Sequence, residues 1–222
     1  MPKAKRLNLD AIETSLRAVQ ANFDRINASL DTPRDPLSDE VLERMLLGYE
    51  QVDAYLVDGV DLFAPGNSSL LLELNILVLC GRDNRVRAEC ASQIEATEAH
   101  FYGKSDGGVE SLVNWVRSLN GVPVWRRAAS TYIHILSQPQ LFIEGNHRTG
   151  SLVMSWTLAN EGKPPFVLSV ENAKAYFDPS ALVKHSRKHS LRMLLERPKL
   201  IKRFGELLKD DAETIHLNGR AR

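Results

Sequence analysis

Residues 140–151 read QLFIEGNHRTGS, and the sequence on either side is organised around this stretch. Residues 128–137 read as a helix that enters it, and residues 147–161 read as a helix that leaves it. Gly145 and Asn146 mark a turn between the two. The stretch therefore predicts a helix–loop–helix unit within an all-α fold.

The loop carries residue types that suit a phosphate and a metal ion. The exit helix begins beside Gly145, so its first backbone N–H groups lack partners within the helix and, with the helix dipole, form an anion site. Arg148 adds a planar fork of donors, and Glu144 is a hard oxygen ligand of the kind that Mg²⁺ takes beside phosphates. The alternative is an ordinary loop in which Glu144 only caps a helix.

The stretch resembles the signature loop H-P-F-x-[D/E]-G-N-G-R-T-x-R of the Fic (Fic/Doc, or Fido) family. The matching residues are Phe142, Glu144, Gly145, Asn146, Arg148 and Thr149. With the flanking helices, the likeness covers residues 109–166. The resemblance implies a Fic-type helical bundle that transfers AMP from ATP, with Mg²⁺, to a hydroxyl of a target protein. It also implies that residues 145–149 contact the nucleotide phosphates and that Glu144 binds the metal.

Several positions that matter for the family's chemistry depart from its pattern. Gln140 stands six residues before Asn146, where the family has its base histidine, and a register with two inserted residues finds Gln138 there. His147 replaces the second glycine and Ser151 the second arginine. A glutamine cannot take a proton, and general base catalysis contributes about 10²–10⁴-fold in rate. We therefore expect nucleotide binding with adenylyl transfer that is weak, altered or lost.

His147 leaves an alternative open. A cation is disfavoured at a helix N-terminus, so a neutral His147 could act as the base of an active transferase with altered chemistry. Its imidazole could equally obstruct the space in which the family's glycine lets phosphate approach the backbone. A further alternative is a non-enzymatic interaction module whose working surface is the N-terminal helices.

Residues 68–75 read SSLLLELN and resemble the inhibitory helix motif [S/T]-x-x-x-E-[G/N] of the same family. Ser69 and Glu73 match it, whereas Leu74 stands in the place of Gly or Asn. In the family this glutamate pairs with the second signature arginine and restrains the γ-phosphate. Because Ser151 occupies that place here, the ion pair cannot form as described. The alternative is an apolar core helix with one glutamate at its edge.

The N-terminal part predicts a helical hairpin. An apolar residue recurs every three or four positions over residues 9–30, and a similar stripe follows over residues 42–56. Asp10 with Glu13 suggests a capping box, prolines in residues 32–36 end the first helix, and Ser38 caps the second. The two stripes either face the protein's own core or form a homodimeric coiled coil.

Further helices are predicted over residues 68–80, 83–101, 109–119, 123–137, 169–177, 179–188 and 198–209. The glycine-rich turn at residues 103–108 is where a small, target-docking β-hairpin flap would lie. The expected organisation is an N-terminal hairpin over residues 1–60, a Fic-like domain over residues 61–209 and a flexible tail over residues 210–222.

Composition bears on which partners and which cellular compartment the chain suits. The 222 residues include 28 basic and 28 acidic side chains, so no general attraction to nucleic acid or to a membrane is expected. Cys80 and Cys90 follow no disulfide or metal pattern, which fits a reducing compartment. The N-terminus lacks the apolar run of a signal peptide, and the longest apolar stretch, residues 70–80, is too short to span a bilayer. A soluble, cytoplasmic protein is therefore expected.

Overall fold

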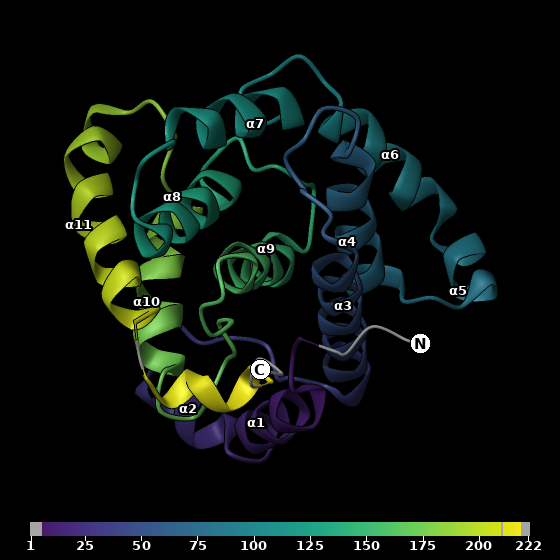
Figure 1. Cartoon of the computed structure of the whole chain (residues 1–222), viewed down its shortest axis with the longest axis vertical. Helices are drawn as coiled ribbons and strands as arrows, with labels where there is room; N and C mark the ends of the chain where they lie inside the picture. Colours follow the sequence, from purple (N-terminus) through teal and green to yellow (C-terminus); the bar gives the residue numbers. More distant parts are fainter. Residues whose placement is uncertain (1–5, 210, 219–222) are drawn as a thin grey trace.

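The computed structural model describes residues 6–209 and 211–218. These residues form eleven α-helices and a short 3₁₀ helix, η1, without a β-strand, so the predicted all-α class is confirmed (Figure 1). The elements are α1 (Leu9–Ala21), α2 (Phe23–Ser29), α3 (Asp39–Asp58), α4 (Ser68–Cys80), α5 (Asn84–Glu89), α6 (Ala91–Phe101), α7 (Val109–Ser118), α8 (Val124–Leu136), α9 (Asn146–Asn160), α10 (Ala173–Lys184), α11 (Leu191–Leu207) and η1 (Asp211–His216).

Helix α9 is the centre of the molecule, with α3 and α4 on one side and α8, α10 and α11 on the other (Figure 1). Two glycines let its neighbours approach closely. A Cβ on Gly150 would lie 2.7 Å from the Tyr132 ring of α8, and a Cβ on Gly48 of α3 would lie 2.4 Å from Leu152. Almost every side chain of α9 is buried, as expected for a helix enclosed on all sides.

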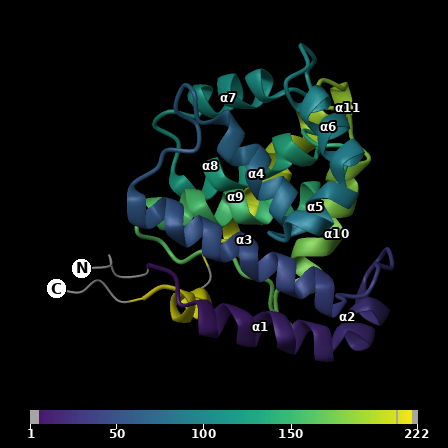
Figure 2. The same ribbon diagram turned by 90° about the vertical axis from the view of Figure 1, so that its right-hand side faces the viewer.

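The N-terminal helices bury their apolar stripes inside the chain itself. Figure 2 shows α1 running along α3, and the stripe residues Ile12, Leu16, Met45 and Tyr49 are buried there. The predicted first helix is interrupted at Asn22, between α1 and α2. A coiled-coil dimer would need side chains that the chain already uses for its own core.

Two predicted helix caps have different outcomes. Ser38 caps α3, as expected, by accepting a hydrogen bond from the backbone N–H of Val41. At α1 the cap is Asn8, whose side chain accepts from Ala11 N–H, so the prediction that Asp10 opens this helix is wrong.

Three helix boundaries differ from the sequence prediction. The predicted helix over residues 83–101 is divided at Cys90 into α5 and α6. The two helices predicted on either side of residue 178 are one, α10, with Pro179 inside it, and α11 begins seven residues before Pro198. Proline removes one N–H and costs about 3 kcal/mol, which burial of flanking side chains such as Tyr176 and Val183 offsets.

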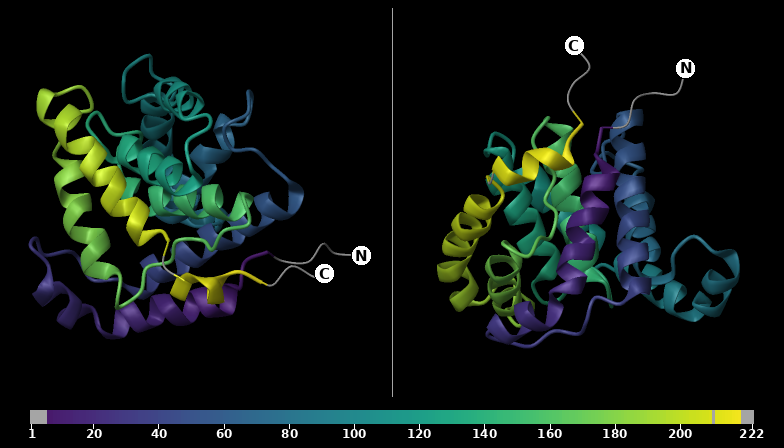
Figure 3. Two further views of the ribbon diagram at one scale, coloured as in Figure 1. Left: turned by 60° about the vertical axis from the view of Figure 1, so that its left-hand side comes forward. Right: turned by 90° about the horizontal axis from the view of Figure 1, so that it is seen from below.

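The C-terminal segment packs against the start of the chain, although the sequence predicted a flexible tail there. Asn8 N–H donates to the His216 carbonyl at 2.9 Å, and Leu7 forms an isolated antiparallel bridge with Leu217 (Figure 3). Residue 210 and residues 219–222 of that predicted tail lie outside the described residues. One apolar cluster contains Leu7, α1, α3, α4 and α9 side chains, so the core continues across the expected boundary at residue 60.

The glycine-rich segment at residues 103–108 consists of turns, and no strand of a β-hairpin flap occurs there or elsewhere in the described part of the chain. Among the described helices, none combines the length and the apolarity that crossing a membrane requires.

Candidate functional site

The loop before α9 depends on a glycine. Gly145 is the N-cap residue of α9 and has a φ of 74°, in the left-handed region that favours glycine. A Cβ at this position would also lie 2.8 Å from the side-chain amide nitrogen of Asn75, on α4. Helix α4 therefore covers the loop closely, and both the conformation and the packing require Gly145.

Asn146 closes the loop on itself. Its Oδ1 accepts a hydrogen bond from the Phe142 N–H at 2.9 Å, and its Nδ2 donates to the Phe142 carbonyl at 2.7 Å. The residue is almost entirely buried. The structure thus gives Asn146, a predicted site residue, a role in holding the loop.

Asn75 connects α4 to the loop. Its Nδ2 donates to the Glu144 carbonyl at 3.0 Å and to the Thr149 hydroxyl at 2.9 Å, and both Asn75 and Thr149 are fully buried. The Thr149 hydroxyl is therefore engaged inside the protein. Sequence reasoning missed Asn75, although an amide in an otherwise apolar helix was a usable signal, because buried polar groups require partners.

Arg148 lies beside the first turn of α9 and is partly buried. One of its Nη groups donates to the Val78 carbonyl near the end of α4, at 2.6 Å. For the other N–H groups of the fork, the described residues provide no hydrogen-bond acceptor. Burial lowers the pKa of Arg148, and the nearby Arg44 lowers it further, while Glu144 and Glu40 oppose the shift. The guanidinium keeps its charge near neutral pH because its ordinary pKa is far higher.

The first turn of α9 carries the kind of backbone donors that an anion site uses. The first bond back to the loop runs from the Thr149 N–H to the Gly145 carbonyl, at 2.9 Å. The described part of the chain supplies no acceptor for the backbone N–H groups of Asn146, His147 and Arg148. These groups and the positive end of the helix favour a bound anion.

Gln140, which stands six residues before Asn146, contacts that residue in the structure. Its Nε2 donates to the Leu136 carbonyl at 3.0 Å, and its Oε1 accepts from Asn146 Nδ2 at 3.4 Å. His100 also contacts the Gln140 backbone carbonyl, at 2.9 Å. The side-chain amide is therefore held at both ends and has no basic group to offer.

His147 is enclosed on the inner side of the loop. Its Nδ1 lies 3.1 Å from the Tyr132 hydroxyl, and its backbone carbonyl accepts from the Tyr176 hydroxyl. Burial, with smaller contributions from Arg34 and Lys184, lowers the pKa of His147 to about 3. An imidazole with so low a pKa is neutral but weakly basic, so it is a poor general base. Sequence reasoning did not identify Tyr132, which holds this ring.

Glu144 is exposed at the outer edge of the loop, where its carboxylate accepts a hydrogen bond from Gln93 Nε2 at 3.1 Å. The described residues contain no group of three or more His, Cys, Asp or Glu side chains that could hold a metal ion. One carboxylate beside an anion site still fits Mg²⁺, because that ion usually takes one or two carboxylates together with phosphate oxygens and water.

The two matching residues of the inhibitory-helix motif, Ser69 and Glu73, do not contact the loop before α9 in the described structure. Glu73 forms an ion pair with Arg87 of α5 at 2.6 Å, and Ser69 is exposed in the first turn of α4. The side chain of Ser151 instead donates to the Arg148 carbonyl, within α9.

Two hollows border α9. One, of about 550 Å³, lies at its C-terminal end between Phe63, Arg117 and Trp156 and includes no loop residue. The other, of about 320 Å³, includes His147, Arg148 and Ser151. A scan of protein-family models found none that matches the chain, and neither curated proteins nor solved structures gave a match.

Proposed function

We propose that this chain is a Fic-type bundle that binds a phosphate-bearing ligand, a nucleotide with Mg²⁺, at the loop from Glu144 to Arg148. The observation that carries the proposal is the first turn of α9, where three backbone N–H groups have no acceptor among the described residues and Arg148 belongs to the same turn. Backbone donors and a guanidinium together suit phosphate oxygens. The exposed carboxylate of Glu144 would bind Mg²⁺ from the solvent side.

We further propose that adenylyl transfer to a protein hydroxyl is weak or lost. Gln140 occupies the position of a base without being one, and its amide is already bonded to the Leu136 carbonyl. The surroundings of His147 disfavour it as a substitute, because its Nδ1 faces the Tyr132 hydroxyl and its pKa is lowered to about 3. Phosphate binding needs none of this proton transfer, so it can persist without catalysis.

Titration calorimetry with ATP–Mg²⁺ tests the binding proposal. The wild-type chain should bind it, and Arg148→Ala should weaken binding by about 1.5–3 kcal/mol, the value of a hydrogen bond to a charged group. Arg85→Ala, which changes an arginine that is 90% exposed on α5, serves as the control and should leave the affinity unchanged. Equal affinity in all three proteins would place the ligand away from this loop, and absence of binding would refute the proposal.

Incubation with labelled ATP, Mg²⁺ and a cell lysate tests the statement about catalysis. We expect little or no label on protein. Strong labelling by the wild-type chain that His147→Gln abolishes would instead identify an active transferase with His147 as its base.

A second candidate function, a protein interaction module, is favoured by the surface of α11. Leu191, Leu194 and Leu195 share one helix face and are between 57% and 81% exposed. Neighbouring exposed leucines of this kind suit a partner or a second copy of the chain. Light scattering should then detect a homodimer that Leu195→Glu dissociates, whereas a monomer would leave only a different protein as the partner.

A further inference from the structure

The hollow of about 320 Å³ lies between the N-terminal helices and the inner side of α9 and α10. Its walls are mainly apolar, and they include Leu16, Val19, Phe23, Met45, Phe166 and Phe177. Protein interiors contain few voids larger than a water molecule, and this volume falls at the lower end of ligand pockets, about 300–1,000 Å³. The hollow is therefore large enough for a small molecule.

Two polar atoms of the residues that line this cavity are buried without a hydrogen-bond partner in the described structure. They are Arg34 Nε and His147 Nε2. Arg34 is otherwise well held, since its backbone N–H donates to Asn27 at 2.7 Å and one Nη donates to the Phe177 carbonyl at 3.2 Å. A buried donor without an acceptor is unfavourable, so a ligand oxygen beside Arg34 would complete the site.

The charges around the cavity favour an anionic ligand. Arg34 and Arg148 line it, Lys184 is close enough to His147 to affect the imidazole, and the acidic group of the lining, Asp35, is on an exposed residue. A guanidinium fork matches the two oxygens of a carboxylate. A phosphate carries more charge, and moving it into such apolar walls would cost more in lost hydration.

We propose that this cavity binds a small carboxylic acid with an apolar body, with its carboxylate on Arg34 and its body against α1, α3 and Phe166. The apolar body would displace water from the apolar walls of the cavity, and the carboxylate would accept a hydrogen bond from Arg34 Nε. The cavity adjoins the first turn of α9, because His147, Arg148 and Ser151 also line it. The proposed carboxylate contact differs from the phosphate contacts, since Arg34 belongs to the connection between α2 and α3 and bonds to α10.

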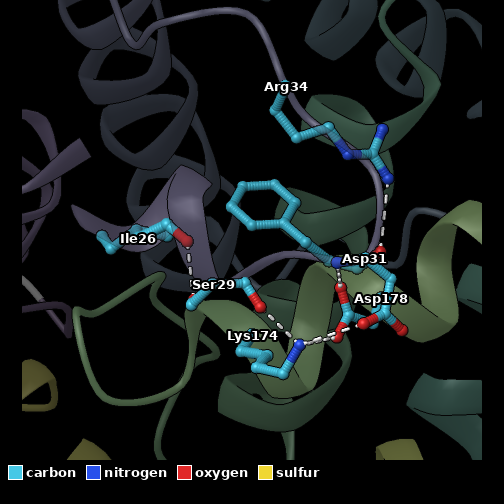
Figure 4. Close-up of polar contacts among 7 residues, drawn as sticks. Ile26, Ser29, Asp31, Arg34, Lys174 and Asp178 are labelled. Atoms are coloured by element: carbon cyan, nitrogen blue, oxygen red, sulfur yellow. Dashed lines mark hydrogen bonds and ion pairs between the residues drawn. The ribbon is translucent and has the colours of Figure 1, made fainter. Parts of the chain in front are cut away.

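Residues 30–37, here called the strap, connect α2 to α3 and contribute Arg34, Asp35, Pro36 and Leu37 to the cavity wall. Figure 4 shows how the strap is fastened to α10. Asp178 accepts from the Asp31 N–H at 3.0 Å, and Lys174 bonds to Asp178 at 2.7 Å and to the Ser29 carbonyl at 2.6 Å. These few polar contacts close one side of the cavity, so release of the strap is the proposed route of access.

Titration calorimetry of the full chain with decanoate, below its critical micelle concentration, tests the proposal. We expect saturable binding of one decanoate per chain and binding of decanol that is at least tenfold weaker. Arg34→Gln should weaken decanoate binding tenfold or more. Arg117→Gln, at an exposed arginine away from this cavity, is the matched control and should bind as the wild type does.

A second variant keeps the test decisive if Arg34→Gln fails to fold. Val41→Phe fills the cavity from α3 and should abolish decanoate binding while circular dichroism confirms the helical fold. Decanol binding as tightly as decanoate, or decanoate binding unaffected by either variant, would overturn the proposal, as would absence of binding. Titration of Arg34→Gln with ATP–Mg²⁺ distinguishes this proposal from the proposed function. Loss of decanoate binding with ATP binding retained supports a carboxylate on Arg34, whereas loss of both ligands would show that they share one site and would overturn the proposal.

Discussion

The side-chain amide of Asn75 donates to the hydroxyl of Thr149 at 2.9 Å and thereby fastens α4 to the first turn of α9. The same amide nitrogen reaches the Glu144 carbonyl, so one residue of α4 fixes both sides of the Gly145 turn. The phosphate-binding geometry proposed here therefore depends on a residue that would not touch the ligand.

Replacing Asn75 should destabilise the protein. Asn75→Ala leaves the Glu144 carbonyl and the Thr149 hydroxyl without their donor in a buried place, which should lower the free energy of unfolding by about 2 kcal/mol or more. Denaturant unfolding followed by circular dichroism measures this. Asn120→Ala, at an exposed asparagine, is the control and should stay within about 0.5 kcal/mol of the wild type. Equal losses in both variants would contradict the role given to Asn75.

Gln140→His should restore a base beside the loop. If ATP binds as proposed, transfer of label to protein should rise by about 10²-fold or more, and the rate should fall below about pH 6.5, where an unperturbed imidazole becomes protonated. Gln138→His is the matched control, because Gln138 occupies the base position in the other register of the loop. A gain only in Gln138→His would show that the other register is correct.

The stability of the fold should decrease in acid because of His134. This residue is buried in α8, 3.2 Å from the Ser111 hydroxyl, and burial, with Lys188, Arg197 and His189 adding to it, lowers its pKa to about 3. Between about pH 6.5 and pH 3 the unfolded chain therefore binds a proton that the folded chain does not. Folded-state stability should fall over this window, by up to about 1.4 kcal/mol per pH unit, and should be unaffected above it.

The free energy of unfolding, measured at several pH values, checks the direction of this pH dependence. His134→Gln should flatten the dependence, although His147, whose pKa is lowered in the same direction, keeps part of it. His185→Gln, at an exposed histidine after α10, is the control and should keep the wild-type slope. An unchanged slope in His134→Gln would mean that the folded protein protonates this residue without penalty.

Asp178→Ala should loosen the strap. The change removes the acceptor of the Asp31 N–H and of Lys174, so exchange of the Asp31 amide with deuterated water should accelerate about tenfold or more. Hydrogen exchange followed by mass spectrometry resolves this segment. Glu171→Ala, at an exposed residue just before α10, should leave the rate as it is. Exchange at the wild-type rate in Asp178→Ala would show that other contacts hold the strap.

Residue patterns predicted the helical class and the helix–loop–helix at Gly145, because turn residues and apolar spacing act locally. They failed where packing between segments that are distant in sequence determines the bounds of a helix. Pro179 and Pro198 lie within helices whose flanking side chains are buried, and Ser190, which caps α11 by accepting from Met193 N–H, was overlooked as a start signal. The position of Leu217 against Leu7 likewise depends on a contact that is remote in sequence.

The candidate site shows the same division. Spacing assigned Gln140 to the base position and Arg148 to the start of a helix, and in the structure Gln140 lies 3.4 Å from Asn146 while Arg148 is in the first turn of α9. Spacing could not show that the Val78 carbonyl accepts a hydrogen bond from Arg148 or that Arg87 forms an ion pair with Glu73. These partners belong to helices whose placement the loop does not determine. The cavity beside Arg34 was missed entirely, since its walls come from segments that meet only in the folded chain.

The bridge between Leu7 and Leu217 makes the fold nearly circular. Joining the chain near these residues with a short linker would close a loop whose entropy cost is small, since closure cost grows slowly with length. New ends could then be cut at residues 104–106, which are exposed in the turns before α7. In such a circular permutant α9 precedes α4 in the chain, so its folding would reveal whether the two helices must be synthesised in their natural succession.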